Sequence, residues 1–179
     1  MKPTQSIFVD PNIWLNENHR SAGCPKKIGE NRTDPKKKSV FQGTNLPAML
    51  KQARLGFQVE VEALMQKDSA DITTEDRELI LERCQESREK AIVITHGTDT
   101  MTETTQFLGS GGGAEGKTIV LVGSFVPLSQ QNSDAMFNLG AAMTAAQTLP
   151  SGVWVAMGGQ IFAWDKVQKN MKEQIFERI

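Results

Sequence analysis

The chain has 179 residues, of which 39% are hydrophobic and 23% charged, and its formal net charge at pH 7 is −1. This length fits one domain of about 100–200 residues. The chain is too apolar to be disordered, and no apolar run approaches the roughly 20 residues of a membrane-spanning helix. A net charge near zero gives no overall attraction to nucleic acid or to an anionic membrane. We therefore expect a soluble globular protein that binds neither.

Cysteine and histidine are scarce. Cys24 and Cys84 are too few for a disulfide framework or a zinc site. His19 and His96 have no cysteine or histidine neighbours, so we expect no bound metal. Residues 1–20 lack the long apolar core of a signal peptide, which favours a cytoplasmic location.

Residues 1–40 differ in charge from the rest of the chain. They contain eight Lys or Arg and four acidic residues, whereas residues 41–179 contain 12 basic and 17 acidic residues. Four prolines and the absence of sustained periodicity predict a poorly ordered basic arm over 1–40, apart from a short strand at 6–9. Such an arm either contacts RNA or an acidic partner or is a solvated tail, and we favour the tail. We expect a folded α/β domain over 41–179.

The first elements of this domain follow clear patterns. Leu46–Leu55 has apolar residues at helical spacing, and Phe57–Leu64 alternates as a strand with one buried face does. The segment 73–90 predicts a helix with Thr74 as its N-cap. Ala91–Thr95 (AIVIT) is a continuous apolar run, typical of a strand covered on both faces.

Helices and buried strands continue to alternate after residue 95. The segment 101–108 predicts a helix, and Thr118–Val122 (TIVLV) predicts a second buried strand. A helix is expected over 133–148 with Ser133 or Asp134 at its cap, followed by a third buried strand at Val153–Met157 (VWVAM). A turn then leads to a short strand at 160–163.

This alternation predicts parallel β-α-β units. The expected fold is an α/β, doubly wound, mainly parallel sheet of the Rossmann-like or flavodoxin-like type, with helices on both faces and therefore three layers. In such sheets the functional residues lie in loops at the carboxyl ends of the strands. We therefore expect the functional residues in the loops after 91–95, 118–122 and 153–157.

The loop after 91–95 reads His96-Gly97-Thr98-Asp99-Thr100 and leads directly into a predicted helix. Two interpretations are open. Thr98 can polarise or position a water while Asp99 binds an ammonium group. Alternatively, Thr100 only caps the helix and Asp99 only complements its dipole.

Several strings in the chain resemble the L-asparaginase family. HGTDTMTET at 96–104 is similar to the family signature HGTDTMxET, and residues 116–127 are similar to GKTIVLTGAMxP. Ser133 to Leu139 resembles the helix start S-D-A/G-x-x-N-L, and 158–170 resembles a stretch that ends in V-x-K. The resemblance covers about residues 41–179, and the end of the chain matches the short, single-domain members. Larger members have a second, C-terminal domain.

The resemblance implies hydrolysis of the side-chain amide of L-asparagine to aspartate and ammonia through a threonine nucleophile and an acyl-enzyme, without a cofactor. Thr98 matches the second catalytic threonine, Lys169 the lysine of the same relay, and Asp99 the carboxylate that holds the substrate α-ammonium. Ser69 lies where the family has a Ser-x-Asp-Met loop that binds the substrate α-carboxylate. We also expect a homo-oligomer.

Simpler interpretations remain for some of these residues. Lys169 follows Lys166 in a charged region, so it can be a solvated surface lysine, and Ser69 can be only an N-cap or turn residue. His96 is expected to pack or to hydrogen-bond its own loop rather than to act as a base.

One part of the family pattern is missing. The family nucleophile lies in a T-G-G-T-I segment after the first strand, but the Gly-Gly pairs here, at 111–113 and 158–159, do not follow a threonine. The chain also has no tyrosine to support that nucleophile. Because residues 1–40 do not resemble this strand and loop, we expect the sheet to lose a central strand together with the nucleophile.

Two functions follow. The first is an amidohydrolase whose nucleophile is another hydroxyl of the arm, such as Thr4, Ser21 or Thr33. The second is a catalytically impaired homologue that binds an amino acid or a partner subunit through the four retained residues Ser69, Thr98, Asp99 and Lys169.

Overall fold

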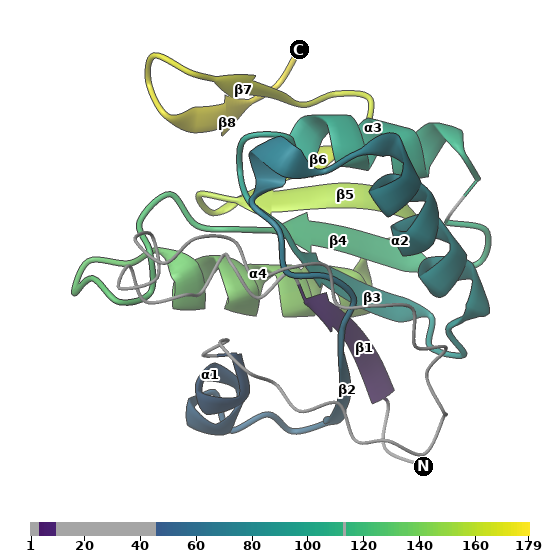
Figure 1. Ribbon diagram of the computed structural model, residues 1–179. Coiled ribbons are helices and arrows are strands. Elements are labelled where there is room, and N and C mark those ends of the chain that lie inside the picture. The colour runs from purple at the N-terminus through teal and green to yellow at the C-terminus, as the bar shows by residue number, and fades with distance from the viewer. Residues whose placement is uncertain (1–3, 10–45, 113) are drawn as a thin grey trace.

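The fold is built around a twisted, mainly parallel sheet (Figure 1). The computed structural model describes residues 4–9, 46–112 and 114–179. Six strands are ordered β2-β1-β3-β4-β5-β6, and all neighbours are parallel except β5 and β6. Their bounds are β1 Thr4–Val9, β2 Gln58–Ala63, β3 Ala91–Thr95, β4 Thr118–Val122, β5 Gly152–Met157 and β6 Gln160–Ala163. The predicted doubly wound α/β fold is confirmed.

The N-terminal segment supplies a central strand, so the expectation that the sheet would lose one was wrong. β1 lies between β2 and β3, with Val9 in register with both Ala63 and Thr95. A strand position requires backbone hydrogen bonds rather than one particular sequence, and Ile7, Phe8 and Val9 are residue types that favour β-structure. The strand predicted at 6–9 is confirmed and begins two residues earlier. The remainder of the predicted arm, residues 1–3 and 10–40, lies outside the described residues.

The four predicted helices are also confirmed. They are α1 Leu46–Gln52, α2 Thr74–Glu86, α3 Met101–Ser110 and α4 Ala135–Thr148. The N-cap of α2 is Thr73 and not Thr74 as predicted. The Thr73 hydroxyl accepts from the Asp76 amide at 3.3 Å, and the Asp76 carboxylate accepts from the Thr73 amide at 2.9 Å. This reciprocal pair is a capping box, which needs the two residues three positions apart.

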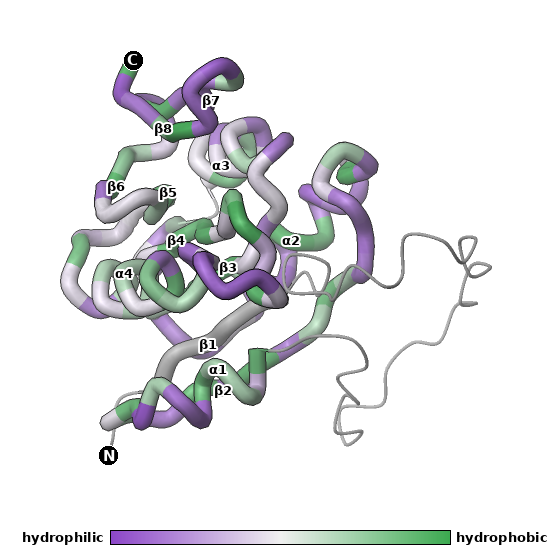
Figure 2. Tube along the Cα trace, turned by 90° about the vertical axis from the view of Figure 1, so that its left-hand side faces the viewer, coloured by the Kyte–Doolittle hydropathy of each residue, from purple (hydrophilic) through white to green (hydrophobic). Residues whose placement is uncertain are grey.

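Helices cover both faces of the sheet and produce three layers, as predicted (Figure 1). Val93 and Val120 face α1 and α4, whereas Ile92, Ile119 and their neighbours face α2 and α3. This alternation explains why the central strands read as unbroken apolar runs, since each face of the strand enters a separate core. Figure 2 shows the hydrophobic stretches gathered along these strands, with hydrophilic segments on the outward turns.

Three short elements were not predicted. η3 is a 3-10 turn at Ser69–Asp71, and β7 (Gln168–Asn170) pairs with β8 (Ile175–Glu177) in an antiparallel hairpin near α3 (Figure 1). Elements of three residues are too short to show a hydrophobic period. No helix within the described ranges is long and apolar enough to cross a membrane.

Candidate active site

The site lies where the direction of winding reverses. β1 and β3 are adjacent, but the chain leaves them toward opposite sides of the sheet, since β2 lies beyond β1 and β4 lies beyond β3. The carboxyl ends of two such strands form the crevice in which doubly wound proteins bind ligands. The loop at 96–100 leaves β3 at this edge and enters α3 at Met101. The loop that the sequence selected is therefore at the topological switch point.

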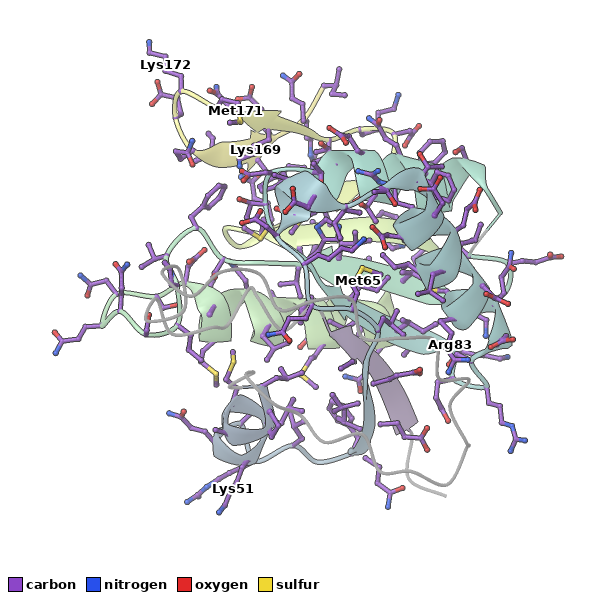
Figure 3. The ribbon with its side chains drawn as sticks, viewed as in Figure 1. Lys51, Met65, Arg83, Lys169, Met171 and Lys172 are labelled. Atoms are coloured by element: carbon purple, nitrogen blue, oxygen red, sulfur yellow. The ribbon has the colours of Figure 1, made fainter. Side chains whose placement is uncertain are left out.

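Lys169 joins the two polar side chains of this loop. Its Nζ donates to Thr98 Oγ1 at 3.0 Å and to Asp99 Oδ1 at 2.7 Å. The Lys169 side chain is only 6% exposed, whereas that of Asp99 is 56% exposed. Lys169 is thus a buried cation beneath an exposed carboxylate, and its interpretation as a solvated surface lysine was wrong. It comes from strand β7 (Figure 3).

The Phe125 ring lies close to the ammonium group of Lys169. Lys169 Nζ lies 5.7 Å from the centroid of the Phe125 ring, a distance at which the ring face attracts a cation. Phe125 follows β4 and packs on Phe176 of β8, with ring centroids 5.7 Å apart. Phe125 was not predicted as a site residue from the sequence. It could have been found from its position in the loop after 118–122, which is one of the three loops at strand carboxyl ends where functional residues were expected.

Ser69 lies against the same loop. It is 5% exposed, and a Cβ built on Gly97 would be 2.3 Å from its Oγ, so the two residues are in direct contact. The Thr100 hydroxyl donates to the Ser69 carbonyl. The N-cap of η3 is Asp68, whose carboxylate accepts from the Ala70 amide at 3.0 Å, so Ser69 is not an N-cap. Ser69, Thr98, Asp99 and Lys169 therefore lie together at one edge of the sheet.

Thr100 occupies the N-cap position of α3 but makes no side-chain capping bond to the described residues. Because its hydroxyl donates to the Ser69 carbonyl instead, the interpretation of Thr100 as a side-chain cap was wrong. The bond connects two loops that the sequence places 31 residues apart.

His96 holds the backbone of its own loop. Its Nδ1 lies 2.7 Å from the Gly97 carbonyl and its Nε2 lies 2.9 Å from Thr104 Oγ1. Since a carbonyl can only accept, Nδ1 carries the proton and Nε2 accepts from the Thr104 hydroxyl. Burial lowers the pKa of His96 to about 4, although its bond to Gly97 acts in the opposite direction. His96 is therefore neutral at pH 7 and supports the loop, as expected.

The register of β1 decides against one candidate nucleophile. Thr4 is paired with Gln58 at the amino end of β1, whereas Val9 is paired with Thr95 beside the site loop. At about 3.3 Å per residue, Thr4 is roughly 17 Å from that carboxyl end. Thr4 thus lies at the wrong edge of the sheet. Ser21 and Thr33, the other hydroxyls considered, lie outside the described residues.

The cluster has a definite chemical capacity. A threonine hydroxyl that accepts a hydrogen bond from a buried ammonium group is positioned to exchange protons through it, and a nearby carboxylate holds that ammonium in place. The exposed carboxylate is also available to a ligand cation. Together with a parallel sheet and its switch point, these features define an α/β protein with a polar cluster at the carboxyl edge of its sheet, the place where such folds usually bind small molecules.

Sequence comparison identifies the family. Residues 28–176 match the family described as "Asparaginase, N-terminal", and the chain belongs to it. The chain is 34% identical to an L-asparaginase from Thermococcus kodakarensis over 116 residues. This matched segment covers 64% of this chain and 35% of that protein. The chain is also 34% identical over 118 residues to a glutaminase-asparaginase from Acinetobacter glutaminasificans, covering 64% and 34%. The chain thus spans about a third of the length of the curated relatives it matches.

Solved structures show the same fold. The thermostable L-asparaginase from Thermococcus kodakarensis superposes with a TM-score of 0.73 at 22% identity, over 99% of this chain and 51% of that one. The probable cytoplasmic L-asparaginase from Campylobacter jejuni gives a TM-score of 0.73 at 21% identity, over 98% and 52%.

Proposed function

We propose that this chain is an asparaginase-type amidohydrolase domain that converts L-asparagine to L-aspartate and ammonia. The observation that carries the proposal is the contact of Lys169 with both Thr98 and Asp99, in a chain of the asparaginase family. Two relatives named L-asparaginase and glutaminase-asparaginase support a substrate with a terminal side-chain amide.

The proposed roles follow from charge and position. Asp99 Oδ1 accepts a hydrogen bond from Lys169, so Oδ2 is the oxygen that would bind the α-ammonium of the substrate. Ser69, on the other side of Gly97, receives the α-carboxylate. The side-chain amide then lies toward Thr98 and Lys169, which act in the chemical step. We assign both catalysis and substrate binding to Thr98 and Asp99, catalysis to Lys169 and substrate binding to Ser69.

The reaction proceeds in two steps. A hydroxyl nucleophile attacks the amide carbonyl, and ammonia leaves with the proton that the hydroxyl gives up, forming an ester. Water then attacks the ester and releases L-aspartate, restoring the hydroxyl. Thr98 and Lys169 transfer protons in these steps. The nucleophile is proposed to come from the chain outside the described residues, where Ser21 and Thr33 are candidates.

Ligand titration and ammonia release test this assignment directly. Asp99→Asn keeps the shape but removes the charge that pairs with the α-ammonium, so it should weaken L-aspartate binding by about ten- to a hundred-fold. Thr98→Val should weaken binding far less than Asp99→Asn, because the Thr98 hydroxyl carries no charge, but it should abolish ammonia release from L-asparagine, because that hydroxyl also acts in the chemical step. Calorimetric titration and an ammonia assay on both variants and the wild type measure these effects.

Asp165→Asn is a matched control, because it removes one carboxylate from an exposed pair with Lys166 and should leave binding unchanged. Equal affinity in the wild type and Asp99→Asn would contradict the ammonium-binding role. Binding without ammonia release by the wild type would indicate the impaired homologue instead.

We also propose a cytoplasmic homo-oligomer. A relative titled as a probable cytoplasmic L-asparaginase supports the location. Sedimentation of the purified chain tests the assembly, and a monomer at micromolar concentration would contradict it.

A further inference from the structure

Arg77 is a buried cation outside the cluster of predicted site residues. It lies in the first half of α2 and is only 9% exposed. Its guanidinium donates to Thr104 Oγ1 at 3.1 Å, to the Ile72 carbonyl at 3.1 Å and to Glu103 Oε2 at 2.9 Å. A buried guanidinium requires such partners, because desolvation of an unpaired charge is costly.

Two of these bonds lead to the two loops of the site. Ile72 ends the turn that begins at Ser69, and its amide donates back to the Ser69 carbonyl at 3.3 Å. Thr104 is fully buried and donates to His96, which in turn holds the Gly97 carbonyl next to Thr98. One guanidinium therefore connects the loop 68–72 with the loop 96–99.

The third bond contributes less. The Glu103 side chain is 62% exposed, and an ion pair with such an exposed partner is weakened by solvent and by salt. The bonds to Ile72 and Thr104 are shielded and charge-assisted, and loss of the guanidinium would leave a buried carbonyl without its donor. The planar fork of arginine can serve both acceptors at once, whereas lysine offers a single nitrogen.

We propose that Arg77 is a positioning residue of the ligand site, which holds the Ser69 loop at a fixed separation from the Thr98–Asp99 loop. The α-carboxylate and α-ammonium of an amino acid are a fixed distance apart. Both can therefore be bound at full strength only if the two loops keep the matching separation. The identity of the ligand rests on the proposed function, whereas the connection between the loops does not.

Arg77→Met tests this role, since it keeps the apolar stem and removes the fork. We expect the affinity for L-aspartate to fall about tenfold. The amides of Asp71 and Ile72, which close the turn by bonds to Asp68 and Ser69, should exchange with deuterium at least about tenfold faster. Amides of β4 should be unaffected. Arg77→Lys should recover part of the affinity, and it serves as the milder variant if Arg77→Met does not fold.

Arg83→Met is the matched control on the same helix. Arg83 makes ion pairs with Glu62 and Glu86 and is 37% exposed, and it lies well apart from Lys169 (Figure 3). Its loss should leave both the affinity and the exchange of 71–72 unchanged, even if overall stability falls.

Exchange separates the two proposals. Faster exchange at 71–72 in the Arg77 variants, but not in Arg83→Met, supports the positioning role even if the wild type binds no L-aspartate. Absence of L-aspartate binding by the wild type would overturn only the proposed function. Unchanged exchange and unchanged affinity in Arg77→Met, or equal changes in Arg83→Met, would overturn the positioning role.

Discussion

The loops after β3 and β4 leave adjacent strands at the same edge of the sheet, but their polar residues serve different purposes. In the first loop, Thr98 and Asp99 face Lys169 from a partly exposed position. In the second, the Asp134 carboxylate accepts from the amides of Phe125 and Val126 at 3.2 and 3.0 Å.

Asn138 completes this second arrangement from within α4. It is fully buried, its Nδ2 donates to the Gly123 carbonyl at 3.1 Å, and its Oδ1 accepts from the Gly158 amide at 3.0 Å. Both loops lie within strings that resemble the same family. The polar side chains of the first string bond to a buried lysine in the proposed ligand site, whereas those of the second satisfy backbone groups. Polarity alone therefore does not distinguish a candidate binding residue from a structural one.

The largest effect is expected at Asn138. Asn138→Leu removes the partners of the Gly123 carbonyl and the Gly158 amide, so we expect the free energy of unfolding to fall by about 3–4 kcal/mol. Urea unfolding measures this loss. Gln147→Ala on the exposed side of the same helix should change stability by less than about 0.5 kcal/mol. A loss below about 1 kcal/mol for Asn138→Leu would contradict the structural role given to the loop after β4.

Acid should lower the stability of the protein through His96, which holds the first loop. Burial lowers the pKa of His96 from 6.5 to about 4, so between these values the unfolded chain binds a proton that the native protein does not. Stability should therefore decrease as the pH falls through this range, by up to about 3 kcal/mol. Urea unfolding between pH 7 and pH 4.5 measures the slope, which should be flatter in His96→Asn. Identical slopes would show that His96 is protonated in the native state.

A smaller steric effect is expected where the two site loops meet. A Cβ on Gly97 would lie 2.3 Å from Ser69 Oγ and 2.5 Å from Ser69 Cβ, so Gly97→Ala must displace the Ser69 loop. We expect a destabilisation of about 1–3 kcal/mol and weaker L-aspartate binding. Thermal unfolding and calorimetric titration measure both. Unchanged affinity in a folded variant would show that Ser69 does not contact the ligand.

The smallest effect, of opposite sign, is expected at Gly140. It lies inside α4, and no heavy atom counted among the described residues approaches within 4 Å of a Cβ built there. Gly140→Ala should therefore stabilise the protein by about 0.5–1 kcal/mol through helix propensity. Thermal unfolding checks this, and a destabilised variant would indicate that α4 is covered at this point.

Local pattern determined most of the fold. Strands buried on both faces are continuous apolar runs, so AIVIT, TIVLV and VWVAM indicated the central parallel strands and the edge at which to look for chemistry. Thr98 and Asp99 were also identified from a local feature, because the string at 96–104 resembles the signature of a known family.

Contacts between distant residues were decided by the tertiary structure. The resemblance assigned Lys169 to the same relay as Thr98, but the contact itself spans 71 residues of sequence and comes from a three-residue strand that has no recognisable period. The register of β1, which places Thr4 at the wrong edge, depends on pairing with β2 and β3 rather than on the six residues themselves. Arg77 reads in the sequence as an ordinary helical arginine, because hydrophobic periodicity reports which face of an element is buried but not which groups that face will meet.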